Sequence, residues 1–141
     1  MKLPQLLMMG IAVLSLNACV SREQADAKLA EGCKAGISVL LPEDQEIKDI
    51  VSTEFTPATE GPSHRHVTII TTLENDWLEE EHEYTCVFEE SFGLFKMNHT
   101  GAIVKLDTND GRVFGKAGGE ILGGAQDWIK ITNAVRVAMY E

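Results

Sequence analysis

The sequence is short of positive charge. It contains 12 lysines and arginines against 22 aspartates and glutamates, which gives a formal net charge of −10. A surface that binds nucleic acid needs a basic patch facing the phosphates, and the densest basic stretch, His64-Arg65-His66, is too small for that role. The same deficit argues against a helix lying on anionic lipid. We therefore expect no nucleic-acid partner. The simplest interpretation of the acidic charge is that it keeps the protein soluble.

The sequence also lacks an apolar run long enough to cross a membrane. The longest such stretch, residues 6–16, is almost wholly apolar, whereas a spanning helix needs about 20 residues. Its length suits the apolar region of a secretory signal, and Met1 and Lys2 before it form a minimal positive start. Residues 1–18 are therefore expected to be an export signal, which ends at the small residue Ala18 before Cys19.

The four residues Leu16-Asn17-Ala18-Cys19 resemble the lipobox of bacterial lipoproteins. In that pattern a leucine lies three positions before the cysteine and a small residue lies directly before it; Asn17 stands where the pattern has Ala, Ser, Thr or Val. The resemblance implies cleavage after Ala18, diacylglycerol on the Cys19 sulfur and acylation of the new amine. Lipoproteins that are sorted to the inner membrane have an aspartate directly after the cysteine. This chain has Val20 at that position, so the resemblance favours the outer membrane, facing the periplasm. The alternatives are ordinary signal cleavage, with Cys19 as a plain residue, and a buried N-terminal helix.

Cysteines are few, at three. If Cys19 carries lipid, Cys33 and Cys86 remain, and an even number in an oxidising compartment favours a disulfide between them. Two independent buried thiols are the alternative. A C-x-x-C pair is absent, so thiol redox chemistry is not expected.

An N-terminal helix is the clearest element of the mature chain. Ser21 and Gln24 have the spacing of a capping box, and apolar residues then recur every four positions to about residue 39: Ala25, Leu29, Cys33 and Ile37. Residues 43–51 are expected to form a second short helix. A last helix is expected over residues 126–139, with one apolar face made of Trp128, Ile131, Val135, Ala138 and Met139.

Strands are expected between these helices. Residues 67–73 are rich in β-branched side chains, and residues 78–88 alternate so that Tyr84, Cys86 and Phe88 share an inner face that Cys33 can reach. Further strands are expected at 92–97, 102–107 and 112–115, with turns near Ser91, at 98–101 and at 109–111. Five glycines from Gly115 to Gly124 are expected to form a mobile linker.

These elements predict an α+β fold with an N-terminal helix, an antiparallel β-meander of about four to five strands and a C-terminal helix. The expected organisation is a signal over residues 1–18, a lipidated tether over 19–24 and one globular domain over 25–141. The arrangement of Cys33, Leu41-Pro42, Asn75, Trp77, Tyr84 and Cys86 also resembles small exported bacterial domains of unassigned function, a resemblance that implies no activity.

Chemical motifs are scarce. Residues 107–111 depart from the calcium-loop spacing, residues 111–116 depart from the phosphate-loop spacing, and Ser63 lacks the glycines of a nucleophile elbow. We therefore expect no enzyme activity and no cofactor. The expected function is a lipid-anchored binding or structural module of the cell envelope, held to the membrane by Cys19 and with an envelope protein as the candidate partner.

The histidines offer an alternative function. His64 and His66 alternate along one strand, His82 lies on the next, and Glu80 or Glu83 lies nearby. Two histidines and a carboxylate would suit zinc or copper. Whether His82 reaches the other two depends on strand register, and solvated histidines beside acids are the simpler interpretation.

Overall fold

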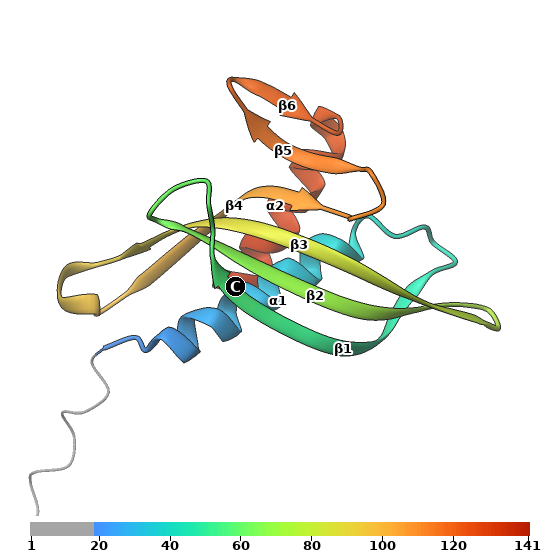
Figure 1. Ribbon diagram of the computed structural model, residues 1–141, viewed down its shortest axis with the longest axis horizontal. Helices are drawn as coiled ribbons and strands as arrows, with labels where there is room; N and C mark the ends of the chain where they lie inside the picture. Colours follow the sequence, from blue (N-terminus) through green and yellow to red (C-terminus); the bar gives the residue numbers. More distant parts are fainter. Residues whose placement is uncertain (1–18) are drawn as a thin grey trace, which may run out of the picture.

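Six strands and two helices make up residues 19–141, the part of the chain that the computed structural model describes. The lipobox-like residues 16–18 and the apolar stretch before them lie outside it. The strands form one antiparallel sheet in chain order (Figure 1). This meander confirms the α+β class, with six strands rather than four to five. The elements are α1 (Arg22–Ser38), β1 (Glu46–Pro57), β2 (His64–Asn75), β3 (Leu78–Phe92), the 3-10 turn η1 (Leu94–Lys96), β4 (His99–Asp107), β5 (Val113–Ala117), β6 (Glu120–Leu122) and α2 (Ala125–Tyr140).

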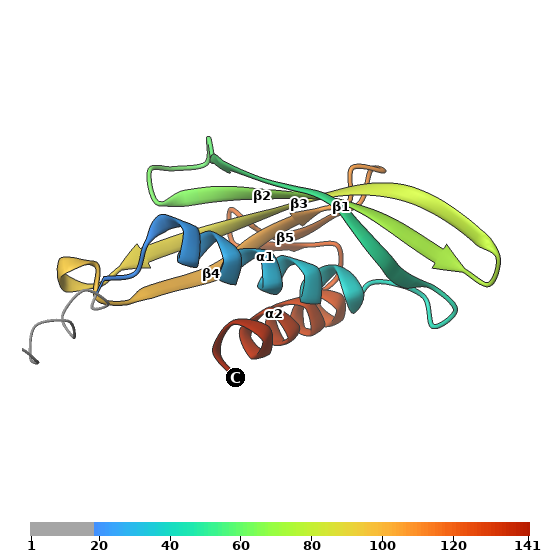
Figure 2. The same ribbon diagram turned by 90° about the horizontal axis from the view of Figure 1, so that it is seen from below.

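Both helices lie on one face of the sheet. Figure 2 shows α1 running beneath the strands and α2 beneath α1, so that α1 forms the middle layer. The inward residues of β2 and β3 pack against α1, among them Val67, Ile69, Tyr84 and Phe88, all at most 3% exposed. The opposite face of the strands β1–β3 is not covered by a helix (Figure 2).

Helix α1 begins as the sequence predicts. Gln24 donates its backbone N–H to the Ser21 hydroxyl, and the Gln24 side-chain oxygen accepts from the Ser21 N–H, which completes the capping box. The residues at spacing four, Ala25, Leu29, Cys33 and Ile37, are all fully buried. The helix therefore uses one apolar stripe to cover the sheet.

The other buried side of α1 consists of two glycines, and it faces α2. A Cβ atom on Gly32 would lie 2.8 Å from both Cγ and Sδ of Met139 and 3.2 Å from Cγ1 of Val135. A Cβ on Gly36 would lie 3.1 Å from Cγ2 of Val135. The glycines lower the helix propensity of α1 but let α2 approach it closely. Side chains of α2 therefore pack almost directly against the backbone of α1.

Replacing Gly32 with alanine tests this close approach, because two physical effects have opposite signs. Alanine improves helix propensity by about 1 kcal/mol, but overpacking against Met139 and Val135 costs about 1–3 kcal/mol. We expect a net loss of about 1 kcal/mol in the free energy of unfolding, measured by urea denaturation. A gain in stability would mean that α2 does not lie against α1 at this point.

The structure joins Cys33 and Cys86 in a disulfide, which confirms the expected pairing. Cys33 lies in α1 and Cys86 in the middle of β3, 53 residues later in the chain, and both are fully buried. The bond therefore fixes α1 to the inner face of the sheet.

The expected second helix at 43–51 is wrong; strand β1 occupies most of it. The inward residues of β1 include Ile47, Ile50 and Phe55, which pack on the core. The register shifts between Ile47 and Asp49 and again between Ile50 and Ser52. An irregularity of this kind adds a residue to a strand, so two inward isoleucines fall three positions apart, a spacing that also suits a helix.

The expected strand at 92–97, with turns on either side of it, is also wrong. Strand β3 continues through Ser91 to Phe92, one turn covers residues 93–98, and β4 already begins at His99. Gly93 closes this turn: a Cβ there would lie 1.7 Å from Oδ1 of Asn98. Only a residue without a side chain fits, so the reversal is fixed at Gly93 rather than at Ser91.

The C-terminal part is more ordered than expected. Instead of a mobile linker, the glycine-rich segment forms the β5–β6 hairpin, with Gly118 and Gly119 at positive φ in its turn. Helix α2 follows, and four of its five expected inward residues are buried: Trp128, Ile131, Val135 and Met139. Ala138 is exposed instead, and Met139 takes the next inward position after Val135.

Tyr84 makes the free energy of unfolding depend on pH. Burial raises the pKa of this phenol above its ordinary value of about 10. Above that pH the unfolded chain loses the proton while the folded chain keeps it, so stability is present below pH 10 and falls as the pH rises further. We expect the free energy of unfolding to decline less steeply above pH 10 in Tyr84→Phe than in the native protein, by urea denaturation at stepped pH. Equal slopes would contradict this assignment.

Candidate functional site

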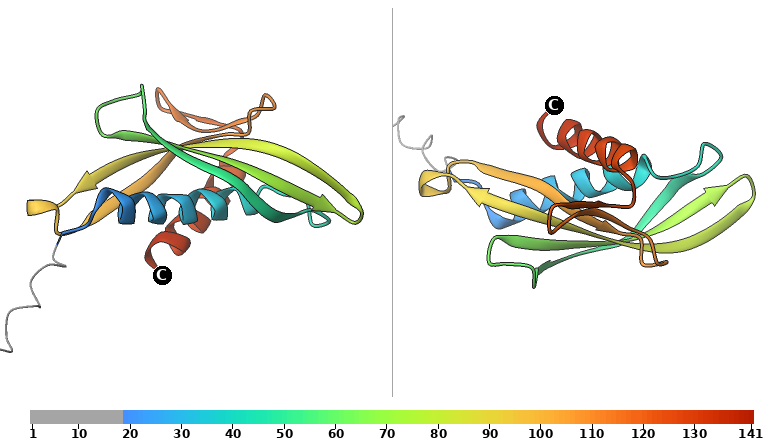
Figure 3. Two further views of the ribbon diagram at one scale, coloured as in Figure 1. Left: turned by 60° about the horizontal axis from the view of Figure 1, so that its bottom comes forward. Right: turned by 90° about the horizontal axis from the view of Figure 1, so that it is seen from above.

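Cys19 lies on the surface at one end of the sheet. It is exposed and is not part of a disulfide. Its thiol lies 3.5 Å from the carbonyl oxygen of Phe95, and the next residue, Val20, donates its backbone N–H to the Lys96 carbonyl at 2.8 Å. Residues 19–24 were expected to form a tether, yet Val20 is bound to the β3–β4 turn and α1 starts at Arg22. Figure 3 shows the start of α1 beside this turn.

We call residues 93–98 the hairpin tip. Its side chains are unusually apolar for a surface turn: Leu94 is 80% exposed, Phe95 79% and Met97 59%. Phe95 and Lys96 adopt positive φ angles of 56° and 55°, a backbone conformation that costs free energy in residues other than glycine. The tip thus presents three large apolar side chains to solvent directly beside Cys19.

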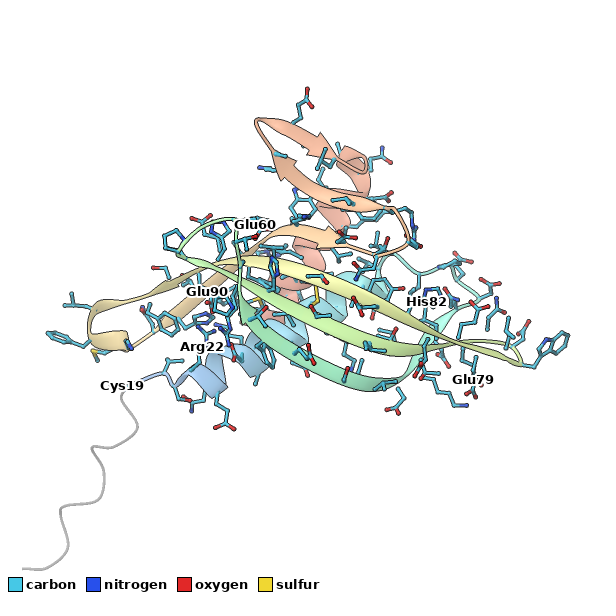
Figure 4. The ribbon with its side chains drawn as sticks, viewed as in Figure 1. Cys19, Arg22, Glu60, Glu79, His82 and Glu90 are labelled. Carbon is cyan, nitrogen blue, oxygen red and sulfur yellow. A yellow bond between two sulfur atoms is a disulfide. The ribbon has the colours of Figure 1, made fainter. Side chains whose placement is uncertain are left out.

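A polar cluster lies behind the tip, between α1 and the inner face of the sheet. Arg65 of β2 binds Asp26 of α1 through two parallel hydrogen bonds, Nε to Oδ1 at 2.6 Å and Nη2 to Oδ2 at 2.7 Å. Arg22, one turn earlier on α1, donates to Asp26 at 2.9 Å and also binds Glu90 of β3. Glu90 in turn accepts from Nε2 of His99 of β4 at 2.8 Å. In Figure 4 the labelled Arg22 and Glu90 point toward each other.

The cluster is mostly shielded from solvent. The side chains of Arg65 and Asp26 are 15% and 13% exposed, and those of Glu90 and His99 are 9% and 2% exposed. Partial burial of Arg22 acts to lower its pKa, but the hydrogen bond and the charge of Glu90, with the charge of Asp26, outweigh that effect and raise the pKa of Arg22. Opposite charges alternate from Arg65 through Asp26 and Arg22 to Glu90, and His99 adds a hydrogen bond to Glu90, so the cluster ties α1 to three strands.

Aromatic rings border this cluster. The Arg22 guanidinium lies 5.3 Å from the centre of the Phe92 ring, and that ring lies 4.9 Å from the His99 ring. On the other side Lys28 donates to the His99 carbonyl at 3.3 Å and lies 4.0 Å above the Tyr140 ring. These contacts hold the start of α1, and hence Cys19, in a fixed place relative to β3 and β4.

Sequence reasoning missed this cluster, although a signal for it exists. Arg65 occupies the same face as Val67 and Ile69, and Glu90 continues the inward series of Cys86 and Phe88. A charged residue at an inward strand position requires a partner. The sequence pattern predicted one strand that begins after Arg65 and another that ends before Glu90. Arg65 was therefore interpreted as part of a small basic stretch and not as an inward strand residue.

The structure does not bring the three candidate histidines together. His66 pairs with Val87 and points to the outer face, whereas His82 pairs with Thr71, which is on the inner face. Those two positions lie five residues apart on β2, roughly 16 Å along a strand. In Figure 4, His82 and Glu79 lie toward the end of the sheet that is away from Cys19.

Two of those histidines lie beside a carboxylate, and the third has a buried ring nitrogen. His66 binds Glu60 at 2.9 Å and His82 lies 3.3 Å from Glu80, while Nδ1 of His64 is buried without a hydrogen-bond partner. Desolvation acts to raise the pKa of the Glu60 carboxyl, but a backbone hydrogen bond and the contact with His66 outweigh it and lower that pKa. Within residues 19–141, no three His, Cys, Asp or Glu side chains converge in a way that could hold a metal ion.

None of the helices in the described part of the chain has the length and apolar character needed to cross a membrane. Comparison of the chain with protein-family models, with curated proteins and with solved structures gave no match, so the functional argument rests on the residues of this protein.

Proposed function

We propose that this protein is a lipid-anchored module of the bacterial cell envelope, held to the membrane by acyl chains on Cys19 and acting by binding or by structure rather than by catalysis. The observation that carries the proposal is the position of Cys19: its thiol is exposed, whereas the other two cysteines are paired and buried. The lipobox-like residues before it supply the chemistry of attachment. The Cys33–Cys86 disulfide is compatible with an exported protein, since such bonds persist in oxidising compartments.

The energetics of acylation agree with an anchoring role. Each buried methylene contributes about 0.8 kcal/mol, so one chain holds a protein marginally and two or three hold it firmly. Because α1 begins only three residues after Cys19, an anchor at this residue would keep the domain close to the bilayer. In this proposal the domain faces the periplasm from the outer membrane.

The proposed partner is an envelope protein that binds the face of the sheet away from the helices. Outward positions of β1 and β3 carry exposed carboxylates, among them Glu54, Glu81 and Glu89. A partner of complementary charge would present a basic surface there.

Acyl labelling in cells tests the anchor. We expect the native protein to incorporate an alkyne-tagged palmitate, detected on the purified band, and Cys19→Ser to incorporate none, because the sulfur that receives the lipid is gone. Ser21→Ala is the matched control two residues away: it removes only the helix cap, at a cost of about 1 kcal/mol, and should label normally. An unlabelled native protein, or equal labelling of Cys19→Ser, would refute the proposal.

A further inference from the structure

The hairpin tip and Cys19 meet at one end of the molecule, and this juxtaposition points to a second membrane contact besides the lipid. The Cys19 thiol is 3.5 Å from the Phe95 carbonyl oxygen, and Val20 is hydrogen-bonded to Lys96. No spacer lies between the attachment atom and the tip. An acyl chain on this sulfur therefore enters the bilayer within a few ångströms of Phe95.

The tip has the composition of a segment that enters a membrane interface. Leu94, Phe95 and Met97 are each more than half exposed, although the hydrophobic effect favours the burial of large apolar side chains. Lys96 lies between them, and residues 93–98 contain no carboxylate. Apolar side chains accompanied by a cation are typical of segments that lie at the boundary between lipid headgroups and acyl chains.

The opposite end of the sheet differs from the tip in charge, although Trp77 and Leu78 are also exposed there. We call residues 43–48 and 74–81 the acidic pole, because they carry eight carboxylates and one lysine, Lys48. The β2–β3 turn at this pole lies at the far end of the 15-residue strand β3 from the tip, roughly 45 Å away. Figure 1 shows the two turns at opposite ends of the sheet. Anionic headgroups repel this pole, which favours an orientation with the tip toward the bilayer.

We infer that the hairpin tip inserts Leu94, Phe95 and Met97 into the bilayer surface beside the acylated Cys19 and orients the domain with its acidic pole away from the membrane. The inference rests on the proposed lipid attachment, and it adds a second contact that the lipid alone does not supply. An acyl anchor by itself leaves a domain free to rotate, whereas two adjacent contacts restrict that rotation. The ion-paired cluster of Asp26, Arg22, Arg65 and Glu90 then holds α1 and the strands of the tip in a fixed relation.

The test places an environment-sensitive dye at either end of the sheet. Phe95→Cys labels the tip and Trp77→Cys labels the acidic pole; both side chains are highly exposed, at 79% and 93%, so neither change disturbs the core. Each full chain is extracted from membranes, labelled and reconstituted into phosphatidylethanolamine–phosphatidylglycerol vesicles with or without brominated acyl chains. Cys33 and Cys86 are paired, and an acylated Cys19 has no thiol, so a single dye attaches.

We expect the dye at position 95 to shift to shorter wavelength and to be quenched several-fold more strongly by brominated chains than the dye at position 77. Adding Leu94→Ser and Met97→Ser to the Phe95→Cys chain should bring its quenching down toward that of position 77. Equal, weak quenching at both positions would overturn the inference. A blue shift at position 95 without bromine quenching would also overturn it, because the tip would then be covered by protein.

An intact mass of each labelled chain separates this inference from the proposed function. A chain without acyl groups, or with a second dye on Cys19, refutes the lipid anchor itself. An acylated chain whose position 95 stays in water refutes only the insertion of the tip.

Discussion

Replacement of both Cys33 and Cys86 by alanine is expected to lower the free energy of unfolding by about 4 kcal/mol. The disulfide closes a loop across 53 residues of sequence separation, and restricting a loop of this size in the unfolded chain accounts for about 4 kcal/mol in the chain-entropy model. Small domains are stable by only about 5–15 kcal/mol. The bond therefore supplies a large share of what holds this fold together.

The measurement is urea unfolding of the native and double-alanine proteins, followed by circular dichroism. We expect a much lower midpoint for the variant, because α1 loses its only covalent tie to β3. Glu31→Ala in the same helix is the matched control, since its carboxylate is exposed; surface changes of this kind stay within about 0.5 kcal/mol. A double-alanine variant as stable as the native protein would contradict the role assigned to the bond.

Replacement of Asp26 by alanine is expected to cost about 3 kcal/mol, the lower end of the range for removing one partner of a buried ion pair. Asp26 accepts two hydrogen bonds from Arg65 and one from Arg22. Without Asp26, the Arg65 guanidinium stays on the inner face of β2, 15% exposed and 5.9 Å from the centre of the Phe55 ring. An uncompensated charge there is more costly than the loss of the contact alone.

Comparing Asp26→Ala with a variant that lacks both charges separates these two costs. Asp26→Leu with Arg65→Leu removes both charges, and we expect the double variant to be more stable than Asp26→Ala, because no unpaired charge remains. Glu31→Ala is the control on the same helix, since its carboxylate is exposed, and it should change stability by no more than about 0.5 kcal/mol. Similar losses for Asp26→Ala and Glu31→Ala, by urea unfolding, would contradict the structural role of the cluster.

Much of the fold could be predicted because local patterns and tertiary packing agree. The capping box and the apolar spacing of four predict helix α1, and the alternation of apolar and polar residues predicts strand β3. The disulfide was predicted from the two cysteines that remain if Cys19 carries lipid, both on inner surfaces that face each other. The meander itself follows from short turns between successive strands, since antiparallel neighbours need no crossover.

The errors arose where tertiary structure changes a local period. The register shifts of β1 place Ile47 and Ile50 three apart, and one turn of a helix has nearly the same spacing. The β3–β4 turn depends on Asn98 filling the space above Gly93, which no single-sequence pattern reveals. The contact between Cys19 and the hairpin tip joins residues 76 positions apart, so the candidate site depends on topology that the sequence alone did not supply.

The central claim is that Cys19 carries lipid, and the intact mass of the protein extracted from membranes tests it most directly. We expect the mass of residues 19–141, less two hydrogens for the Cys33–Cys86 bond, plus diacylglycerol and an amide-linked acyl chain. Reduction should add the two hydrogens back without removing the acyl groups. The mass of the uncleaved 141-residue chain, or of residues 19–141 without acyl groups, would contradict the account.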